Sequence, residues 1–277
     1  MHLTGYSDRW SVRPGEDIAF HVHCASAMFQ AELVRLIHGD ENPLGPGRKQ
    51  LRVPSGIDGS YPGAKRTIHK GSFASIDLDG LLRGINDYTI SLWIWPTLPG
   101  PGDQGLVSWL EGMEGHGLGI FISPDARILC RYAGGKVLAS SHPLALREWY
   151  HLIVAVDRGM LSLRIASGRW QPAFAKPEVV SVALEAAIEP PEGRPLLIAA
   201  GWQHDAVFNG KIARARIESA GRAIVAWDFG LEMHSTAVRD TVGGRHGRLH
   251  NRPARAVTGP GWPGNATATS ADRKSVV

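Results

Sequence analysis

The stretch from Arg147 to Ile165, REWYHLIVAVDRGMLSLRI, constrains the fold of this chain more than any other. It predicts an apolar strand that begins at Trp149, a short Asp157-Arg158-Gly159 turn, and a second strand. In the second strand, apolar and polar residues alternate, so that one face is apolar and the other polar. The first strand is apolar on both faces as far as Val156, which predicts a central strand covered on both sides. Because two strands alone are marginally stable in water, this hairpin requires further strands beside it.

The rest of the sequence supplies such strands. Tyr88 to Trp95 alternates strictly, with Tyr88, Ile90, Leu92 and Ile94 on one face, and Pro96 follows it. Further short strands are predicted at 106–110, 118–122, 128–132, 136–140, 179–184, 196–200, 208–218 and 223–229. The chain has 33 glycines and 18 prolines, and its strands do not alternate with long helices. The sequence therefore predicts an all-β fold, dominated by an antiparallel sandwich.

We expect four regions along the chain: a small N-terminal β unit at 1–70, the sandwich at 71–220, a return strand and linker at 221–262, and a disordered tail at 263–277. In the first region a strand is predicted from Ile18 to Val22, and 31–38 fits either a strand or a short helix. Residues 54–72 have few apolar anchors and predict a long connection. Three strands are too few to close a sandwich, so we expect this region to have open edges and to pair with strands encoded after 262.

Composition and charge exclude several classes of protein. The net charge is +4, and the arginines between Arg239 and Arg255 lie in a segment with glycine and proline, which favours a solvated or partner-facing loop. We therefore expect no nucleic-acid partner, because a dedicated binder concentrates basic and aromatic residues. No apolar run is long enough to cross a membrane, and no signal peptide is visible. Cys24 and Cys130 are far apart and predict reduced, buried thiols in a cytoplasmic protein.

The residues that could carry chemistry favour structural roles. His21 and His23 share one strand face but lack a third metal ligand, so we expect both to be solvated. His116 lies in a flexible glycine-rich loop. A glycosidase would need two carboxylates on facing strands. Asp157 and Asp228 are the candidates for such a pair, and both fall at strand ends. No catalytic residue is assigned, because the sequence also lacks a G-x-S-x-G turn between a strand and a helix.

Two binding patterns remain open. Oxygen ligands that a calcium site would need are available at Asp77, Asp79, Asp87 and Asp103. No D-x-D-x-D-G loop is present, so we assign no metal ligand. Tryptophans could stack on a sugar, although most of them lie within strands and are expected in the core: Trp93, Trp95, Trp109, Trp149, Trp202 and Trp227.

The predicted sandwich resembles the laminin-G-like, concanavalin A-like jelly roll. The matching segments are DYTISLWIWP, GLGIFISPDARILCRY, the stretch from Arg147 to Ile165, and FNGKIARARI. The flanking segments AELVRLIHGDENPLGPG (31–47) and HGRLHNRPARAVTG (246–259) resemble the large subunit of N,N-dimethylformamidase. In that family a similar sandwich lies near the N-terminus, and the resemblance extends over 3–262.

The resemblance implies a parent enzyme that hydrolyses formamides to an amine and formate. It also implies that the catalytic iron, held by tyrosines and a glutamate, belongs to a later domain, so no cofactor is expected in this chain. The implied partners are the remainder of the large subunit and a small subunit. We expect this chain to be the non-catalytic N-terminal portion, in which the sandwich serves packing or substrate access. The alternative is a carbohydrate-binding, lectin-like module.

The last six residues, DRKSVV, read like a translated sequencing adaptor that runs into a stop. We therefore expect the tail to be artefactual and the reading frame to have been cut near Ala271.

Overall fold

The protein is described from a computed structural model that covers residues 3–9, 11–42, 44–66, 71–78, 80–112, 115–169, 172–188, 191–202, 206–261 and 275–276. Contacts between residues divide the chain into two units, Met1–His69 and Lys70–Val277. The division falls one residue before the boundary that the sequence predicted.

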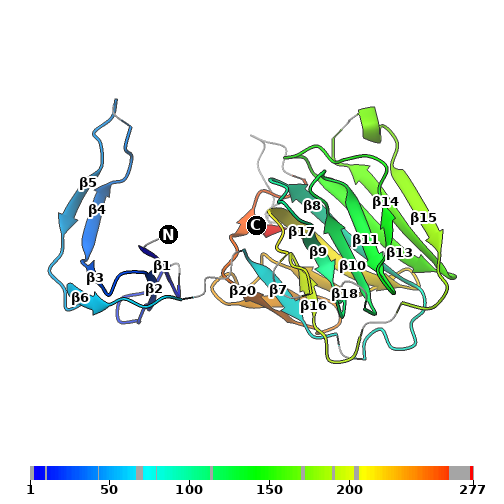
Figure 1. Ribbon diagram of the computed structural model, residues 1–277, viewed down its shortest axis with the longest axis horizontal. Coiled ribbons are helices and arrows are strands. Elements are labelled where there is room, and N and C mark those ends of the chain that lie inside the picture. The colour runs from blue at the N-terminus through cyan, green and yellow to red at the C-terminus, as the bar shows by residue number, and fades with distance from the viewer. Residues whose placement is uncertain are drawn as a thin grey trace. The chain divides into compact units, whose positions relative to one another are not determined.

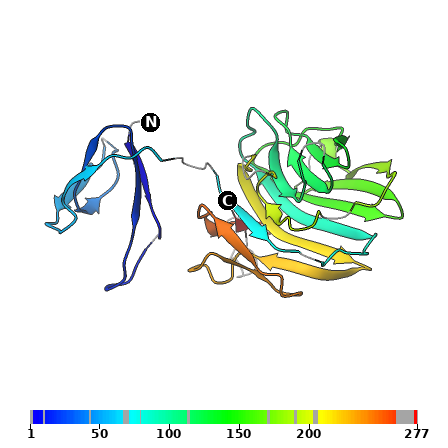
Figure 2. The same cartoon turned by 60° about the horizontal axis from the view of Figure 1, so that its bottom comes forward.

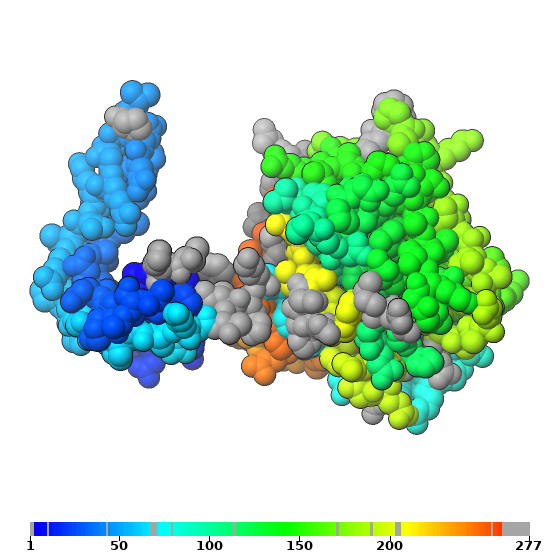
Figure 3. Space-filling model, viewed as in Figure 1, coloured from blue at the N-terminus to red at the C-terminus, as the bar shows by residue number. Residues whose placement is uncertain are grey.

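The first unit consists of three separate two-stranded antiparallel sheets (Figure 1). Their pairs are β1 (Leu3–Ser7) with β2 (Phe20–Cys24), β3 (Met28–Ala31) with β6 (Gly59–Pro62), and β4 (Val34–His38) with β5 (Lys49–Arg52). Residues 31–38 are thus extended rather than helical. Cys24 is the one buried hydrophobic residue among those described in this unit. In Figure 3 the β4–β5 hairpin forms a narrow arm of the first unit.

Two predictions for the first unit are wrong. The expected connection at 54–72 contains β6, which pairs with β3. The strand expected from Ile18 to Val22 begins at Phe20, whose side chain is exposed while His21 and His23 are half-buried. The alternation predicted an inward Phe20, but its side chain is exposed, so the pattern did not decide burial there.

The second unit is an antiparallel sandwich made by one continuous ladder of strands that folds over into two layers (Figures 1 and 2). The first sheet has the order β12 (Lys136–Ala139), β11 (Ile128–Tyr132), β10 (Leu118–Ile122), β9 (Gln104–Ser108), β16 (Leu196–Ile198), β7 (Phe73–Ile76), β20 (Gly247–His250), β19 (Ala237–Asp240). The second sheet has the order β18 (Arg222–Asp228), β17 (Gly210–Ser219), β8 (Tyr88–Pro96), β13 (Tyr150–Asp157), β14 (Met160–Ser167), β15 (Glu178–Ala183). The pairing of β18 with β19 joins the two sheets at one edge. The jelly-roll fold class that the sequence predicted is confirmed.

The predicted hairpin lies inside the second sheet. β13 pairs with β14 on one side and with β8 on the other, so it is an interior strand. Arg158 (φ 48°) and Gly159 (φ 73°) both have positive φ, the backbone of a two-residue type I′ hairpin turn. One face of the hairpin enters the core, where Leu152 and Ile165 lie side by side and are fully buried.

The expectation that the first hairpin strand is covered on both faces is wrong. His151, Ile153 and Ala155 alternate with the buried residues and are half-buried. Only one sheet of the sandwich packs on β13, on the side of Leu152. The other side forms the outer face of the second sheet, where apolar residues such as Ile153 remain partly accessible.

The region after residue 220 also differs from the prediction. Residues 221–262, expected to form a return strand and a linker, contribute β18, β19 and β20 to the sandwich, and β20 pairs with β7. β21 (Arg255–Val257) pairs with β22 (Ser275–Val276), which also pairs with β17. Apart from these two residues of β22, the predicted tail at 263–277 lies outside the described residues.

The core of the second unit lies between the two sheets. The predicted inner face of β8, from Tyr88 to Ile94, is buried at every second position. It meets buried residues of the first sheet such as Ile120 in one cluster. A short 3-10 helix, η1 (Pro172–Phe174), adds Phe174 against Tyr150. Among the described residues, no helix could span a membrane.

Candidate functional site

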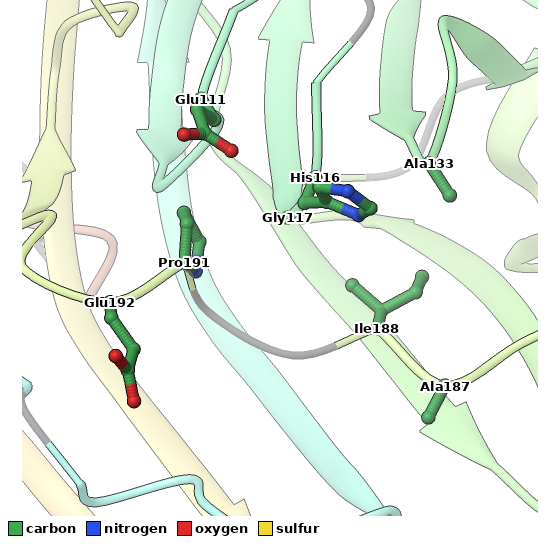
Figure 4. A pocket seen from close by; sticks show the side chains of 8 residues that line it. All are labelled: Glu111, His116, Gly117, Ala133, Ala187, Ile188, Pro191 and Glu192. Atoms are coloured by element: carbon green, nitrogen blue, oxygen red, sulfur yellow. The ribbon is translucent and has the colours of Figure 1, made fainter.

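A pocket of about 490 Å³ opens in the second unit where three connections between strands meet (Figure 4). These are the connections β9–β10, β11–β12 and β15–β16. Its lining residues are Glu111, His116, Gly117, Ala133, Ala187, Ile188, Pro191 and Glu192. A pocket of this size is in the range of small-molecule sites.

Backbone contacts fix the wall that carries His116. The N–H of Glu111 donates to the carbonyl of His116 at 3.0 Å, which closes the β9–β10 loop. Gly117 follows with φ of 102°, and a Cβ there would lie 2.6 Å from the carbonyl oxygen of Trp109. Only glycine fits this position without displacing the backbone. The flexible glycine-rich loop of the sequence is therefore a closed turn that presents an imidazole.

The opposite wall is anchored in the core. The buried hydroxyl of Tyr88 donates to the carbonyl of Ile188 at 3.1 Å, and burial raises the pKa of Tyr88 well above its usual value. The ring of Trp109 lies against Tyr88 with a centroid distance of 6.1 Å. The indole Nε1 of Trp109 is buried and has no hydrogen-bond partner among the described residues.

The polar groups of the pocket can bind but are not arranged for acid–base catalysis. Figure 4 shows the His116 ring between Glu111 and Glu192 on one side and Ala133 on the other. Glu192 is mostly exposed and pairs with Arg83 at 2.6 Å. Among the described residues, no hydrogen bond joins the His116 imidazole to a carboxylate or a hydroxyl. The carboxylates can accept hydrogen bonds from a small polar molecule, and the imidazole can accept or donate one.

The predicted carboxylate pair is not brought together. Asp157 is exposed at the end of β13, 3.7 Å from the guanidinium of Arg158. Asp228 ends β18, and its carboxylate accepts the N–H of Gly230 at 2.8 Å. Two further strands, β17 and β8, separate β18 from β13 in the sheet.

The carboxylates considered for calcium also have separate partners. Asp87 accepts the N–H of Arg158 at 2.9 Å, and Asp103 pairs with Arg131. Asp77 is described, whereas Asp79 lies outside the described residues. Within the described ranges, no group of three or more His, Cys, Asp or Glu side chains is close enough to hold a metal ion.

The histidine pair of the first unit is occupied by local contacts. His21 stacks on Tyr6 with ring centroids 5.1 Å apart, and Nδ1 of His23 accepts the N–H of Arg66 at 2.9 Å. The expectation of two solvated histidines is therefore wrong, since both are half-buried.

The tryptophans divide between the core and the outer surface. Trp109, Trp149 and Trp227 are buried, so the expected core position holds for three of the six rather than for most of them. Trp93, Trp95 and Trp202 are half-buried. The first two lie on the outer face of the second sheet, where the alternation of β8 places them.

The segment between Arg239 and Arg255 is structured, which corrects its interpretation as a solvated loop. The guanidinium of Arg255 donates to the backbone carbonyls of Phe229, Leu231, Glu232 and Ser235, and burial lowers its pKa. Asp240 is buried and accepts four backbone N–H groups, from Ala226, Val242, Gly243 and Arg245. No residue pattern predicts either network, because the partners are backbone groups brought close by strand pairing.

Comparisons with known proteins support the predicted resemblance. No protein-family model matches the chain. The chain is 28% identical to the N,N-dimethylformamidase beta subunit of Paracoccus aminophilus over an alignment of 319 positions, which covers 96% of this chain and 41% of that subunit. It is also 28% identical to the beta subunit from an Alcaligenes species, over 95% of this chain and 41% of that subunit. The chain thus spans about two fifths of the length of these relatives.

Solved structures with related folds are more distant. They include a carbohydrate-binding protein candidate from Bacteroides ovatus (12% identity, 74% of this chain and 65% of that chain, TM-score 0.47). The CBM40 domain of the Ruminococcus gnavus IT-sialidase (14%, 54% and 88%, 0.40) and the LG1–3 region of the laminin alpha2 chain (11%, 55% and 31%, 0.42) are also similar. These likenesses carry no argument about function. The sequence comparison, in contrast, confirms the predicted resemblance of this chain to the beta subunit of N,N-dimethylformamidase.

Proposed function

We propose that this chain is a non-catalytic portion of a dimethylformamidase-like amide hydrolase, in which the sandwich packs against the rest of the enzyme and shapes access to its active site. The observation that carries the proposal is the similarity to two beta subunits along nearly the whole chain, which spans only 41% of either one. The partners would be the remainder of the large subunit and a small subunit, in the cytoplasm.

The arrangement of polar residues supports a non-catalytic role. Amide hydrolysis needs a nucleophile or activated water beside a base and a group that stabilises the oxyanion. The acid–base candidates described above lie on separate elements: His116 at the pocket, Asp157 on β13 and Asp228 on β18.

Two buried tyrosines, Tyr88 and Tyr150, do not fit the iron site that the resemblance implies for the family. The Tyr88 hydroxyl donates to a backbone carbonyl, and the Tyr150 hydroxyl accepts the N–H of Ala145 at 2.9 Å. Both are buried in the core, on different strands. We therefore propose no metal chemistry for the described part of this chain.

The proposal is tested by exchanging this chain for the matching segment of the Paracoccus aminophilus beta subunit. We expect the chain alone, with or without added iron salts, to release no formate from N,N-dimethylformamide, and the chimeric enzyme to release it. Formate release by the chain alone would contradict the proposal. Full activity of a beta subunit from which the segment has been deleted would contradict a role in packing or access.

A carbohydrate-binding module is the second candidate, favoured by the pocket with Glu111, His116 and Glu192. Carboxylates at a pocket rim accept hydrogen bonds from sugar hydroxyls. Glycan-array binding that is lost in Glu111→Gln but retained in Asp157→Asn would support it. An absence of glycan binding would leave the packing role as the better account.

A further inference from the structure

The outer face of the second sheet carries a cluster of aromatic and cationic side chains, which we call the arginine face: Trp93, Trp95, His151, Arg164, Arg214 and Arg216. Strand register places these residues together from four strands. Across one row, Trp93 of β8 lies between Ala213 of β17 and His151 of β13. The row beside it runs from Arg216 through Ser91 and Ile153 to Arg164.

The aromatic rings of this face are held by contacts within the sheet. Trp93 stacks on His151 with centroids 4.9 Å apart and an interplanar angle of 8°. The Nε2 of His151 lies 2.8 Å from the hydroxyl of Ser91. Trp95 has Lys211 over its ring at 5.2 Å. One ring face of each tryptophan is therefore already occupied, which leaves less ring surface for stacking on sugars or nucleic-acid bases.

The arginines, in contrast, are incompletely paired. Arg164 and Arg214 form no ion pair or hydrogen bond within the described part of the chain, and Arg216 pairs only with Glu218, at 2.9 Å. Arg214 lies at the bulge of β17 with φ of 54°, and its side chain is exposed. All three guanidinium charges act on His151, whose pKa is lowered by burial and then by these charges. The arginine face thus carries positive charge that is not fully paired, next to the apolar side chains of Trp93 and Ile153.

We propose that the arginine face docks an acidic protein segment, whose carboxylates pair with Arg164, Arg214 and Arg216 and whose apolar side chains cover Trp93 and Ile153. The inference rests on the packing role proposed above and names the surface that performs it. Guanidinium groups match carboxylates with two parallel hydrogen bonds. Tryptophan and arginine are also the residues most enriched at the energetic centres of protein interfaces. Arg164 and Arg216 are three strands apart, about 14 Å, which fits an extended acidic segment across the strands better than one small anion.

The test uses the full chain and a defined probe, deca-L-glutamate, with affinity measured by titration calorimetry at low and high salt. We expect binding at low salt that weakens as salt screens the exposed charges. Arg164→Gln and Arg216→Gln should each weaken the affinity about two- to fivefold, and together by the product. Arg248→Gln is the matched control, because Arg248 is exposed on β20 in the other sheet. Unchanged thermal unfolding of the variants shows that they are folded.

Two polyanions of matched charge distinguish an acidic peptide from a glycan or a nucleic acid as the ligand of the arginine face. An oligogalacturonate of ten units presents ten carboxylates on a glycan, and an eleven-residue oligothymidylate presents ten phosphates. Tighter binding of either one than of the peptide, with the same loss in Arg164→Gln, would overturn the proposal, as would absence of peptide binding. Salt-sensitive dimerisation of the chain that is lost in Arg216→Gln would overturn it in favour of a second copy. Failure here leaves the formate-release test of the chimeric enzyme unaffected, so the two proposals fail separately.

Discussion

At the scale of single residues, His151 shows how the environment sets the chemistry of a side chain. Its ring is half-buried between Trp93 and β14, beside three arginines, and its pKa is lowered, first by burial. A histidine of this kind is neutral in the folded protein at neutral pH and accepts a hydrogen bond through its Nε2 when the Ser91 hydroxyl donates.

The lowered pKa predicts the direction of a pH effect on stability. The unfolded chain protonates His151 near its ordinary pKa of about 6.5, whereas the folded protein resists protonation. The contribution of neutral His151 to the free energy of unfolding is therefore fully present above pH 6.5 and is lost as the pH falls toward the lower folded pKa. Urea unfolding of the wild type and of His151→Gln, followed by tryptophan fluorescence from pH 7.5 to 5, measures this contribution.

The substitution should make the unfolding free energy less dependent on pH in that window. His234→Gln, which removes an exposed histidine, is the control for the loss of one imidazole. Identical slopes for the wild type and His151→Gln would show that the ring titrates normally in the folded protein.

At the scale of elements, the β19–β20 hairpin depends on one buried carboxylate. Asp240 ends β19 and accepts backbone N–H groups from β18 and from the turn at Val242 to Arg245. The carboxylate itself is buried, so these backbone N–H groups satisfy a charge that would otherwise lie in the protein without partners.

Replacing Asp240 by asparagine should destabilise the second unit. The amide has one acceptor oxygen in place of two, and its NH₂ would face N–H groups that need an acceptor. Hydrogen bonds to charged groups contribute about 1.5–3 kcal/mol, so Asp240→Asn should lower the free energy of unfolding by at least that amount. Asp157→Asn, at an exposed carboxylate, should change it by less than about 0.5 kcal/mol. Equal urea midpoints for the two variants would contradict this role.

At the scale of the whole molecule, the two units differ in how they are stabilised. The second unit has a continuous core between two sheets. In the first unit many apolar residues of the strands are exposed instead: Leu3, Tyr6, Phe20, Met28, Leu36, Ile37, Leu51 and Tyr61. Isolated two-stranded sheets are marginal in water, so the first unit has little to hold it folded.

Limited proteolysis should therefore cleave the first unit before the second. Trypsin at low enzyme ratio should remove residues up to about Lys65 or Arg66 while the sandwich persists, because cleavage follows local unfolding. Mass spectrometry of the products over time measures the order. Resistance of residues 1–69 equal to that of the sandwich would contradict the expectation, and with it the hypothesis that their edges are completed by other strands.

The sequence by itself determined the strands of the second sheet and the inner face of β8, but not the strands β7, β19 and β20 of the first sheet. The alternation from Tyr88 to Trp95 and the turn at Arg158 and Gly159 were predictable, because side-chain period and turn backbone are local properties. Only the tertiary structure decided which strands are neighbours. Register between strands distant in the sequence places β20 beside β7 and joins the residues of the arginine face from four strands. Strand pairing also makes the expected loop after Asp240 part of the sheet. The sequence could not predict this, because backbone hydrogen bonds to distant partners leave no pattern in the residues that make them.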